Sequence, residues 1–260
     1  MENGSDLTSK GQLLEVKDIH IGFAQERHSL FEKKKKKEVL KGVSFSMREG
    51  EVLGLVGESG CGKSTLARVI LGLERAKSGE VIHHSQHPQM VFQDPYGSLN
   101  PAKRIGWILE EPLRIRGGYT AQEREKKALD MLRRVGLEEK MADRYPSQLS
   151  GGQRQRVCIG AALMLNPRLL IADEAVSALD VTIQAQVLSL LLSLKEEMGL
   201  AILFISHDMR VVYQMSDRVI IMKDGRFVES GDVDSVYFSP QHPYTKELLM
   251  AAGIRKEDEK

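Results

Sequence analysis

The fold is decided by the stretch Gly57-Glu-Ser-Gly-Cys-Gly-Lys63-Ser64, which fits the phosphate-binding pattern G-x-x-x-x-G-K-[ST] in full. The apolar run from Glu51 to Val56 predicts a strand before it, and helical spacing from Lys63 to Leu73 predicts a helix after it. Glycines let the backbone wrap around a phosphate, and N–H groups at a helix N-terminus attract the anion. A glycine-rich turn that merely starts a helix would not explain why the lysine and the serine occur together. The stretch therefore predicts a phosphate site in a strand–loop–helix unit.

The composition favours one catalytic α/β unit in a reducing compartment. The chain has 260 residues, with 37 Lys plus Arg against 36 Asp plus Glu, so no global field would concentrate nucleic acid or anionic lipid. The two cysteines, Cys61 and Cys158, are too few for a disulfide framework. The polar N-terminus, and an apolar-rich run from Val181 to Leu194 of only 14 residues, predict neither an export signal nor a membrane span.

Other runs predict the remaining elements. Leu13 to Phe23 and Val39 to Met47 predict two strands that form an antiparallel edge. The pattern from Asn100 to Tyr145 is helical and predicts a separate helical lobe, with an amphipathic helix over Ala121 to Val135. Three short apolar runs predict parallel strands that are buried on both faces: Leu169 to Ala172, Ala201 to Ile205 and Val219 to Met222.

The segment Leu169-Leu-Ile-Ala-Asp173-Glu174 adds two acids at the end of a predicted strand. In a phosphate site of this kind, Lys63 reaches the β and γ phosphates, while Ser64 and Asp173 hold Mg²⁺. Glu174 can then polarise the attacking water as a general base. Two acids alone could instead be solvated residues at a strand end. Together with the phosphate loop they predict nucleotide hydrolysis.

A phosphate loop with an acidic strand also fits kinases, GTPases and helicases, so the segment Leu149-Ser-Gly-Gly-Gln153, followed by Arg154-Gln-Arg156, is decisive. With this segment, the sequence resembles ABC (ATP-binding cassette) ATPases over roughly Leu13 to Met250, with the motifs in the family's order. The resemblance implies an α/β fold: a P-loop NTPase core with an antiparallel β edge and an inserted helical subdomain. It implies a single domain over 13–250, in which 13–92 and 157–235 form the RecA-like core and 93–156 form the helical and signature subdomain. Residues 236–260 are then a C-terminal tail.

The segment Leu149 to Gln153 is similar to the family's signature segment. The resemblance also implies that MgATP binds between the phosphate loop of one subunit and the signature segment of a second one. The backbone from Ser150 to Gly152 would contact the γ phosphate held by the partner, although Ser150 could instead be a plain N-cap. Gln93 is similar to the family's Q-loop glutamine, His207 to its switch histidine, and the run from Ser177 to Asp180 to its D-loop. Phe23 lies where an aromatic residue stacks on adenine, but Phe is also an ordinary core residue.

These expectations define a full set of site residues. The predicted catalytic residues are Glu174, His207 and Gln93. The predicted cofactors are ATP and Mg²⁺, with Ser64, Gln93 and Asp173 as the Mg²⁺ ligands. The predicted nucleotide-binding residues are Gly57, Glu58, Ser59, Gly60, Cys61, Gly62, Lys63, Ser64, Thr65, Phe23, Asp173, Ser150, Gly151, Gly152, Gln153 and Asp180.

Two segments narrow the resemblance to peptide and nickel importers: Phe92-Gln-Asp-Pro-Tyr-Gly-Ser-Leu-Asn-Pro101 and the ending Pro240-Gln-His-Pro-Tyr-Thr-Lys246. This resemblance implies a second, different ATPase subunit, two transmembrane permeases and an extracytoplasmic solute-binding protein. It places the chain on the cytoplasmic face of the cell membrane, where 95–112 would receive the permeases. Ala175 replaces the proline that usually follows the catalytic glutamate, which favours nickel slightly over peptides.

Two other functions compete with this interpretation. A soluble ABC-type ATPase that acts on nucleic acid or ribosomes would normally carry two cassettes or a long coiled-coil insertion, and we expect no nucleic-acid partner. A small-molecule kinase would leave the signature segment and His207 unexplained. The histidines at 83, 84 and 87 lack a carboxylate or thiolate that would complete a nickel site. The lysine run from Lys33 to Lys37 is predicted to be a solvated loop tip.

Overall fold

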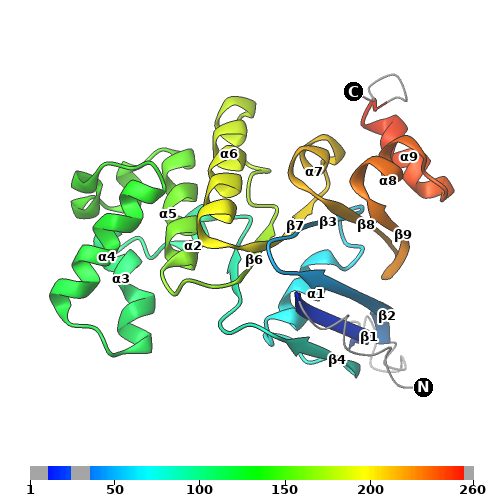
Figure 1. Ribbon diagram of the computed structural model, residues 1–260, viewed down its shortest axis with the longest axis horizontal. Helices are drawn as coiled ribbons and strands as arrows, with labels where there is room; N and C mark the ends of the chain where they lie inside the picture. Colours follow the sequence, from blue (N-terminus) through cyan, green and yellow to red (C-terminus); the bar gives the residue numbers. More distant parts are fainter. Residues whose placement is uncertain (1–10, 25–35, 255–260) are drawn as a thin grey trace, which may run out of the picture. The chain divides into compact units, whose positions relative to one another are not determined.

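The computed structural model describes residues 11–24 and 36–254, so most of the lysine run from Lys33 to Lys37 lies outside the described residues. The chain divides into two compact units, whose helices and strands are labelled in Figure 1. Unit 1 consists of Met1–Ser85 and Leu203–Lys260, and unit 2 of Gln86–Ile202. The predicted boundaries at 92, 156 and 235 differ from these limits, and the predicted domain division stays a prediction.

An antiparallel sheet in unit 1 confirms the predicted β edge. Its order is β2-β1-β4, formed by β1 (Gln12–Ala24), β2 (Lys36–Arg48) and β4 (Ser78–His83). The register pairs Val16 with Phe45 on β2 and with Val81 on β4. Apolar residues of β1 are buried on both sides of a register shift that lies between Val16 and Ile19: Leu13, Leu14, Val16, Ile19 and Ile21.

A second group of strands in unit 1 carries the phosphate loop. β3 (Val52–Val56) pairs in parallel with β8 (Arg218–Lys223), and β8 pairs antiparallel with β9 (Arg226–Asp232). The other neighbour of β3 is β7 (Ala201–Ser206), the strand in which the boundary between the units falls. Every residue of β3 and β7 is buried, as the apolar runs predicted.

The helices of unit 1 are α1 (Lys63–Ile70), α7 (Met209–Met215), α8 (Val233–Phe238) and α9 (Pro243–Ala251). The end of α8 and the whole of α9 lie in the segment 236–260, which the sequence marked only as a tail. α9 begins where His242 accepts a hydrogen bond from the Tyr244 N–H, with Pro243 at the first helical position, where its missing N–H costs nothing. Tyr237, Tyr244 and Leu249 are buried, so this segment is part of the core of unit 1.

Unit 2 combines two parallel strands with most of the helices. The strands are β5 (Gln89–Val91) and β6 (Leu169–Asp173). The helices are α2 (Pro95–Ser98), α3 (Ile105–Arg116), α4 (Ala121–Arg134), α5 (Gly151–Leu163) and α6 (Val181–Met198), with 3₁₀ turns η1 (Glu139–Asp143) and η2 (Pro146–Gln148). α3 packs against α4 and α5, and Leu109 of α3 and Met131 of α4 both lie near Gly160 of α5. The predicted amphipathic helix is therefore confirmed as α4, which begins at a capping box of Thr120 and Glu123.

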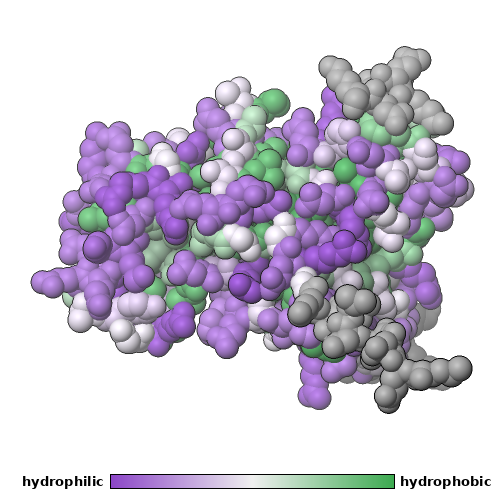
Figure 2. All heavy atoms as spheres, in the orientation of Figure 1, coloured by the Kyte–Doolittle hydropathy of each residue, from purple (hydrophilic) through white to green (hydrophobic). Residues whose placement is uncertain are grey.

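Hydrophilic residues predominate on the face shown in Figure 2. Among the described residues, no helix is both long and apolar enough to cross a bilayer.

Candidate functional site: a phosphate loop and a glutamine–glutamate pair

The phosphate loop runs from Gly57, at the end of β3, to Gly62, which is the N-cap of α1. A Cβ at position 57 would lie 2.2 Å from the carbonyl oxygen of Met222 on the neighbouring β8, so only glycine fits between the two strands. Gly62 has a φ of 116°, which residues with a side chain rarely adopt. These two positions fix both ends of the loop that the sequence predicted.

Lys63 is 5% exposed, and backbone oxygens hold its ammonium group. Nζ donates to the carbonyl of Gly57 over 2.6 Å and to that of Glu58 over 2.9 Å. A buried cation requires such partners, and phosphate oxygens are stronger acceptors than neutral carbonyls. Lys63 is thus held at the loop by groups that nucleotide phosphates can replace.

The remaining predicted loop residues are accessible. Glu58, Ser59, Gly60 and Ser64 are exposed, while Cys61 and Thr65 are half-buried. Burial raises the pKa of the Cys61 thiol, although the nearby Lys63 opposes this. Ser64 lies in the first turn of α1 and, because it is exposed, is accessible from solvent.

Two other predicted residues of unit 1 lie at strand ends. His207 is exposed and directly follows the buried strand β7. The next residue, Asp208, caps α7 by accepting from the N–H groups of Arg210 and Val211. Phe23, near the end of β1, is 42% exposed and pairs with Lys37 of β2. Phe23 is therefore not buried in the way that an ordinary core residue is.

In unit 2, strand register brings Gln93 and Glu174 together. β5 and β6 run parallel with Gln89 opposite Leu170 and Val91 opposite Ala172. Continuing this register by two residues places Gln93 opposite Glu174. Nε2 of Gln93 donates to Oε2 of Glu174 over 2.9 Å.

The backbone of Glu174 has a φ of 48°, in the left-handed region. A following turn holds it there, because the N–H and the hydroxyl of Ser177 both donate to the Glu174 carbonyl, over 3.1 and 3.0 Å. Such a conformation costs about 1 kcal/mol for a residue other than glycine and is common at functional sites. Asp173, one residue earlier at the end of β6, is 7% exposed, and Ala175 fills a buried position.

The signature segment forms the N-terminus of α5. Ser150 is the N-cap: its hydroxyl accepts from the Gln153 N–H over 3.3 Å, and its own N–H donates to Gln153 Oε1 over 3.0 Å. A Cβ at Gly152 would lie 2.5 Å from Cγ2 of Ile183 on α6, so this glycine permits a close approach of two helices. Ser150 therefore does cap a helix, and the N–H groups of the first turn remain the ones that can bind an anion.

Asp180 is exposed and caps α6 by accepting from the Ile183 N–H over 3.0 Å. Around it, Ser177, Ala178 and Val181 are also exposed, and Val181 reaches 83% exposure. The predicted D-loop is therefore a surface segment of unit 2.

The predicted Mg²⁺ ligands have suitable chemistry. The hydroxyl of Ser64, the carboxylate of Asp173 and the amide oxygen of Gln93 are the hard oxygen donors that Mg²⁺ prefers. Because Gln93 donates through Nε2, its amide oxygen is the atom that can act as a ligand. Within residues 11–24 and 36–254, no group of three or more His, Cys, Asp or Glu side chains is placed to hold a metal ion.

The candidate histidine cluster has structural partners instead. Nε2 of His83 bonds to the carbonyl of Ile70 over 2.8 Å, and Nε2 of His84 bonds to Glu15 Oε1 over 2.9 Å. The sequence did not predict a carboxylate beside His84, and the absence of a nickel site stays a prediction.

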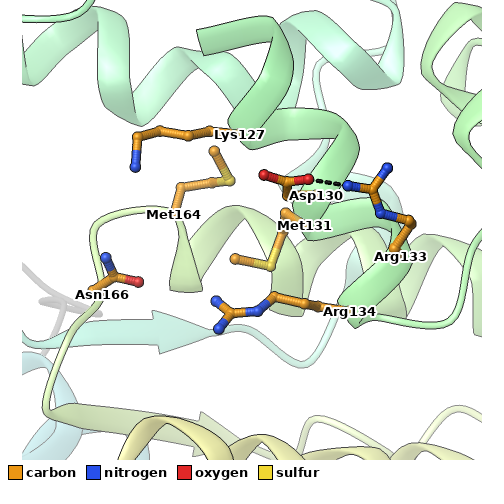
Figure 3. A pocket seen from close by; sticks show the side chains of 7 residues that line it. All are labelled: Lys127, Asp130, Met131, Arg133, Arg134, Met164 and Asn166. Carbon is orange, nitrogen blue, oxygen red and sulfur yellow. Dashed lines mark hydrogen bonds and ion pairs between the residues drawn. The ribbon is translucent and has the colours of Figure 1, made fainter. Parts of the chain in front are cut away.

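A surface pocket in unit 2 contains none of the predicted site residues (Figure 3). Lys127, Asp130, Arg133 and Arg134 of α4 line it together with Met131, Met164 and Asn166. Arg133 pairs with Asp130 and Glu139, and Arg134 pairs with Glu197. Because acids already neutralise both arginines, this pocket is a poor candidate for an anion site.

The sequence did not predict a contact between the phosphate loop and α9. The hydroxyl of Tyr244 on α9 accepts a hydrogen bond from the Glu58 N–H over 3.3 Å. Tyr244 belongs to the segment from Pro240 to Lys246 that narrowed the family resemblance. A contact between residues 186 positions apart, however, leaves no local pattern in the sequence.

Comparison with known proteins identifies the family. The model of the ABC transporter family matches residues 40–177, which hold the phosphate loop, the signature segment and the Asp173–Glu174 pair. The chain belongs to the ABC transporter family as an ATP-binding subunit. It is an ABC ATPase, and the α/β fold predicted from its P-loop and signature segment is confirmed.

The similar curated proteins carry transport names. The dipeptide transport ATP-binding protein DppF of Haemophilus influenzae is 47% identical over 240 residues, covering 86% of this chain and 73% of the relative. The oligopeptide transport ATP-binding protein AppF of Bacillus subtilis is 45% identical, covering 94% and 79%. The glutathione import ATP-binding protein GsiA of Pectobacterium atrosepticum is 49% identical over 82% of this chain, which spans 36% of that relative.

Solved structures agree with the fold. A dimeric cassette, MJ0796, in a post-hydrolysis state with ADP and phosphate has a TM-score of 0.73 and 31% identity, covering 85% of this chain and 99% of that chain. A second dimeric structure of this cassette has a TM-score of 0.74.

Proposed function

We propose that this ABC ATPase powers the import of peptides by binding and hydrolysing MgATP. The observation that carries the hydrolytic role is the hydrogen bond from Gln93 Nε2 to Glu174 Oε2 over 2.9 Å. A general base must lie within hydrogen-bond reach of the proton that it accepts, so its side chain has to be held in position. Gln93 holds the Glu174 carboxylate in place, and this carboxylate accepts the proton of the attacking water.

The other site residues supply binding and electrostatics. Lys63 exchanges the carbonyls of Gly57 and Glu58 for the β and γ phosphates, and His207 contacts the γ phosphate. Mg²⁺, held through Ser64, Asp173 and Gln93, neutralises charge on the phosphates when it is bound. Phe23, with 42% of its surface exposed, offers its ring to the adenine.

A second ATPase subunit completes the site in this proposal. The exposed N-terminus of α5 at Ser150 offers backbone N–H groups to a γ phosphate held by the partner. The exposed Asp180 and Val181 fit a D-loop that lies against the other subunit. The dimeric cassette among the similar structures supports such pairing, and we propose a heterodimer of two different ATPase subunits.

The helical part of unit 2 offers a surface for two permeases. Between Pro95 and Pro112, Tyr96 is 66% exposed, and Trp107 is half-buried with the Lys103 ammonium 4.5 Å from its ring centre. Trp107 is therefore not fully a core residue. An extracytoplasmic binding protein would deliver the solute, and the chain would lie on the cytoplasmic face of the cell membrane.

The cargo is proposed from the relatives. Their names refer to dipeptides, oligopeptides and glutathione, which supports a peptide cargo. The expected slight preference for nickel rests on Ala175 alone, a buried position that contacts no solute. We therefore propose peptide import over nickel import.

Copurification from the native source tests this proposal. The chain is tagged, native membranes are solubilised gently, and its partners are identified by mass spectrometry. We expect two permeases and a second ATPase subunit. The associated binding protein is then titrated with a mixed peptide library and, separately, with Ni²⁺.

Saturable binding of peptides supports the proposal, whereas binding of Ni²⁺ without peptides replaces its cargo. Recovery only with ribosomes or nucleic acid would overturn the importer role. A Lys63→Ala chain is the control, because loss of ATP binding should leave assembly with the permeases intact.

A further inference from the structure

Helix α9 contacts the phosphate loop through the hydroxyl group of a tyrosine. The hydroxyl of Tyr244, at the start of α9, accepts from the Glu58 N–H over 3.3 Å. Tyr244 is 3% exposed, and burial raises its pKa, so the hydroxyl stays protonated and neutral at physiological pH. This tyrosine belongs to the ending from Pro240 to Lys246, which has no role in the function described above.

The peptide unit that joins Gly57 to Glu58 is held on both sides. Its carbonyl oxygen accepts from Lys63 Nζ over 2.6 Å, and its N–H donates to Tyr244 over 3.3 Å. In a trans peptide, the carbonyl and the N–H point in opposite directions. The plane of this peptide, and with it the carbonyl that holds the Lys63 ammonium, therefore depends on Tyr244.

Tyr244 is itself fixed by its surroundings. The Lys223 ammonium lies 4.2 Å from the centre of its ring. The carboxylate of Glu229 on β9 accepts from the N–H groups of Gln241 and His242, over 2.7 and 3.1 Å, and so anchors the chain just before α9. A rigid support of this kind can hold a loop in one orientation.

The hairpin of β8 and β9 also contacts the phosphate loop directly. The Gly225 N–H, in the turn between these strands, donates to the carbonyl of Cys61 over 3.1 Å. The hairpin thus contacts the phosphate loop directly through Gly225 and indirectly through Glu229 and Tyr244.

We propose that Tyr244 is a positioning residue of the ATP site, which sets the orientation of the Gly57–Glu58 peptide and thereby the place of the Lys63 ammonium. The competing explanation is that Tyr244 only packs α9 into the core of unit 1 and that its hydroxyl does not affect the loop. The two explanations differ in what the hydroxyl does, because the ring packs against Lys223 in either case.

Three variants of the full chain separate these explanations. Tyr244→Phe removes the hydroxyl and keeps the ring, whereas Tyr244→Ala removes both. Tyr213→Phe is the matched control: it removes a tyrosine hydroxyl in the same unit that donates to Asp234 Oδ1 over 3.1 Å, away from the loop. Calorimetry measures the Kd for MgADP, steady-state kinetics give KM and kcat for MgATP, and thermal unfolding gives Tm.

For Tyr244→Phe, we expect the Kd for MgADP and the KM for MgATP to rise about fivefold, which corresponds to one neutral hydrogen bond. We expect kcat to stay within about twofold, because the hydrolytic groups are untouched. Tyr213→Phe should leave Kd and KM at the wild-type values. Tyr244→Ala should weaken binding at least as much as Tyr244→Phe and lower Tm further, because the packing is lost as well.

An unchanged Kd for Tyr244→Phe would overturn the proposal even if Tm falls, because a purely structural tyrosine affects Tm alone. An equal rise in Kd for Tyr213→Phe would also overturn it, since the effect would then be general. Should Tyr244→Ala fail to fold, the comparison of the two phenylalanine variants still decides.

Discussion

Gln93 and Glu174 are 81 positions apart, yet Nε2 of one lies 2.9 Å from Oε2 of the other. The parallel register of β5 and β6 explains their contact, since each residue lies two positions beyond the pair formed by Val91 and Ala172. The glutamine therefore orients the proposed general base, while a left-handed backbone at position 174 presents the carboxylate at the end of β6.

Replacing Glu174 with glutamine should remove hydrolysis and keep nucleotide binding. The amide oxygen can still accept from Gln93, but it cannot take a proton from water. We expect kcat to fall by at least about 100-fold. The Kd for MgATP should stay near the wild-type value, and a dimer with bound ATP should accumulate, as measured by size-exclusion chromatography. Glu196→Gln, in a side chain that is 78% exposed on α6, is the control and should behave as wild type. Hydrolysis above a tenth of the wild-type rate would contradict the role of Glu174.

Ser150→Arg should abolish hydrolysis while sparing ATP binding by the same chain. The substitution places a long cation at the exposed N-terminus of α5, where the partner's γ phosphate is proposed to bind. It also removes an N-cap, which costs about 1 kcal/mol of folding stability.

Thr120→Arg controls for that cost, because Thr120 caps α4 of the same unit through an equivalent capping box. The control should lose similar stability in urea unfolding and retain hydrolysis. Equal loss of hydrolysis in both variants would assign the effect to the helix caps and count against a composite site.

The sequence predicted those parts of the fold and the site that depend on local pattern. The apolar runs placed β3, β6, β7 and β8, because strands that are buried on both faces need continuous apolar sequence. The glycines and the lysine of the phosphate loop have requirements that few other structures share, so their spacing alone located this loop.

Contacts between distant segments could not be predicted in this way. The bond from Glu58 to Tyr244 depends on how α9 packs, which no periodicity encodes. α9 itself was missed because its nine residues, Pro243 to Ala251, give too few turns for a clear apolar stripe. β5 spans only three residues, so the register that joins Gln93 to Glu174 was equally invisible.

Gly57→Ala should destabilise the fold as well as prevent nucleotide binding. The added methyl group would lie 2.2 Å from the carbonyl oxygen of Met222 and 2.9 Å from Sγ of Cys61. Met222 belongs to β8, whose pairing with β9 prevents an easy shift. We expect a loss of about 2 kcal/mol or more in urea unfolding.

Gly231→Ala is the matched control for this glycine. Its methyl group would lie 3.3 Å from Cγ2 of Val236, the end of a side chain that can adjust. It should unfold near the wild-type midpoint and bind MgADP normally. A Gly57→Ala chain as stable as this control would show that the two strands can separate at the loop.

Cys158 should make the protein less stable at alkaline pH. This residue of α5 is 8% exposed, and burial, with a smaller contribution from the charge of Asp94, raises the pKa of its thiol from 9.0 to about 12. Above pH 9 the thiol ionises in the unfolded chain but stays protonated in the folded one, so the unfolded state binds fewer protons and stability falls as pH rises. The stability that the protonated thiol provides is complete below pH 9 and is lost progressively up to about pH 12.

The comparison of wild type with Cys158→Ala isolates this effect from lysines and tyrosines, which titrate in both chains. Urea unfolding at pH 8 and at about pH 10.5 gives the free energy of unfolding of each protein. We expect wild type to lose up to about 2 kcal/mol more than the variant between these pH values. Equal losses would mean that the thiol ionises as easily in the folded chain as in the unfolded one. This outcome would contradict a raised thiol pKa in the folded chain.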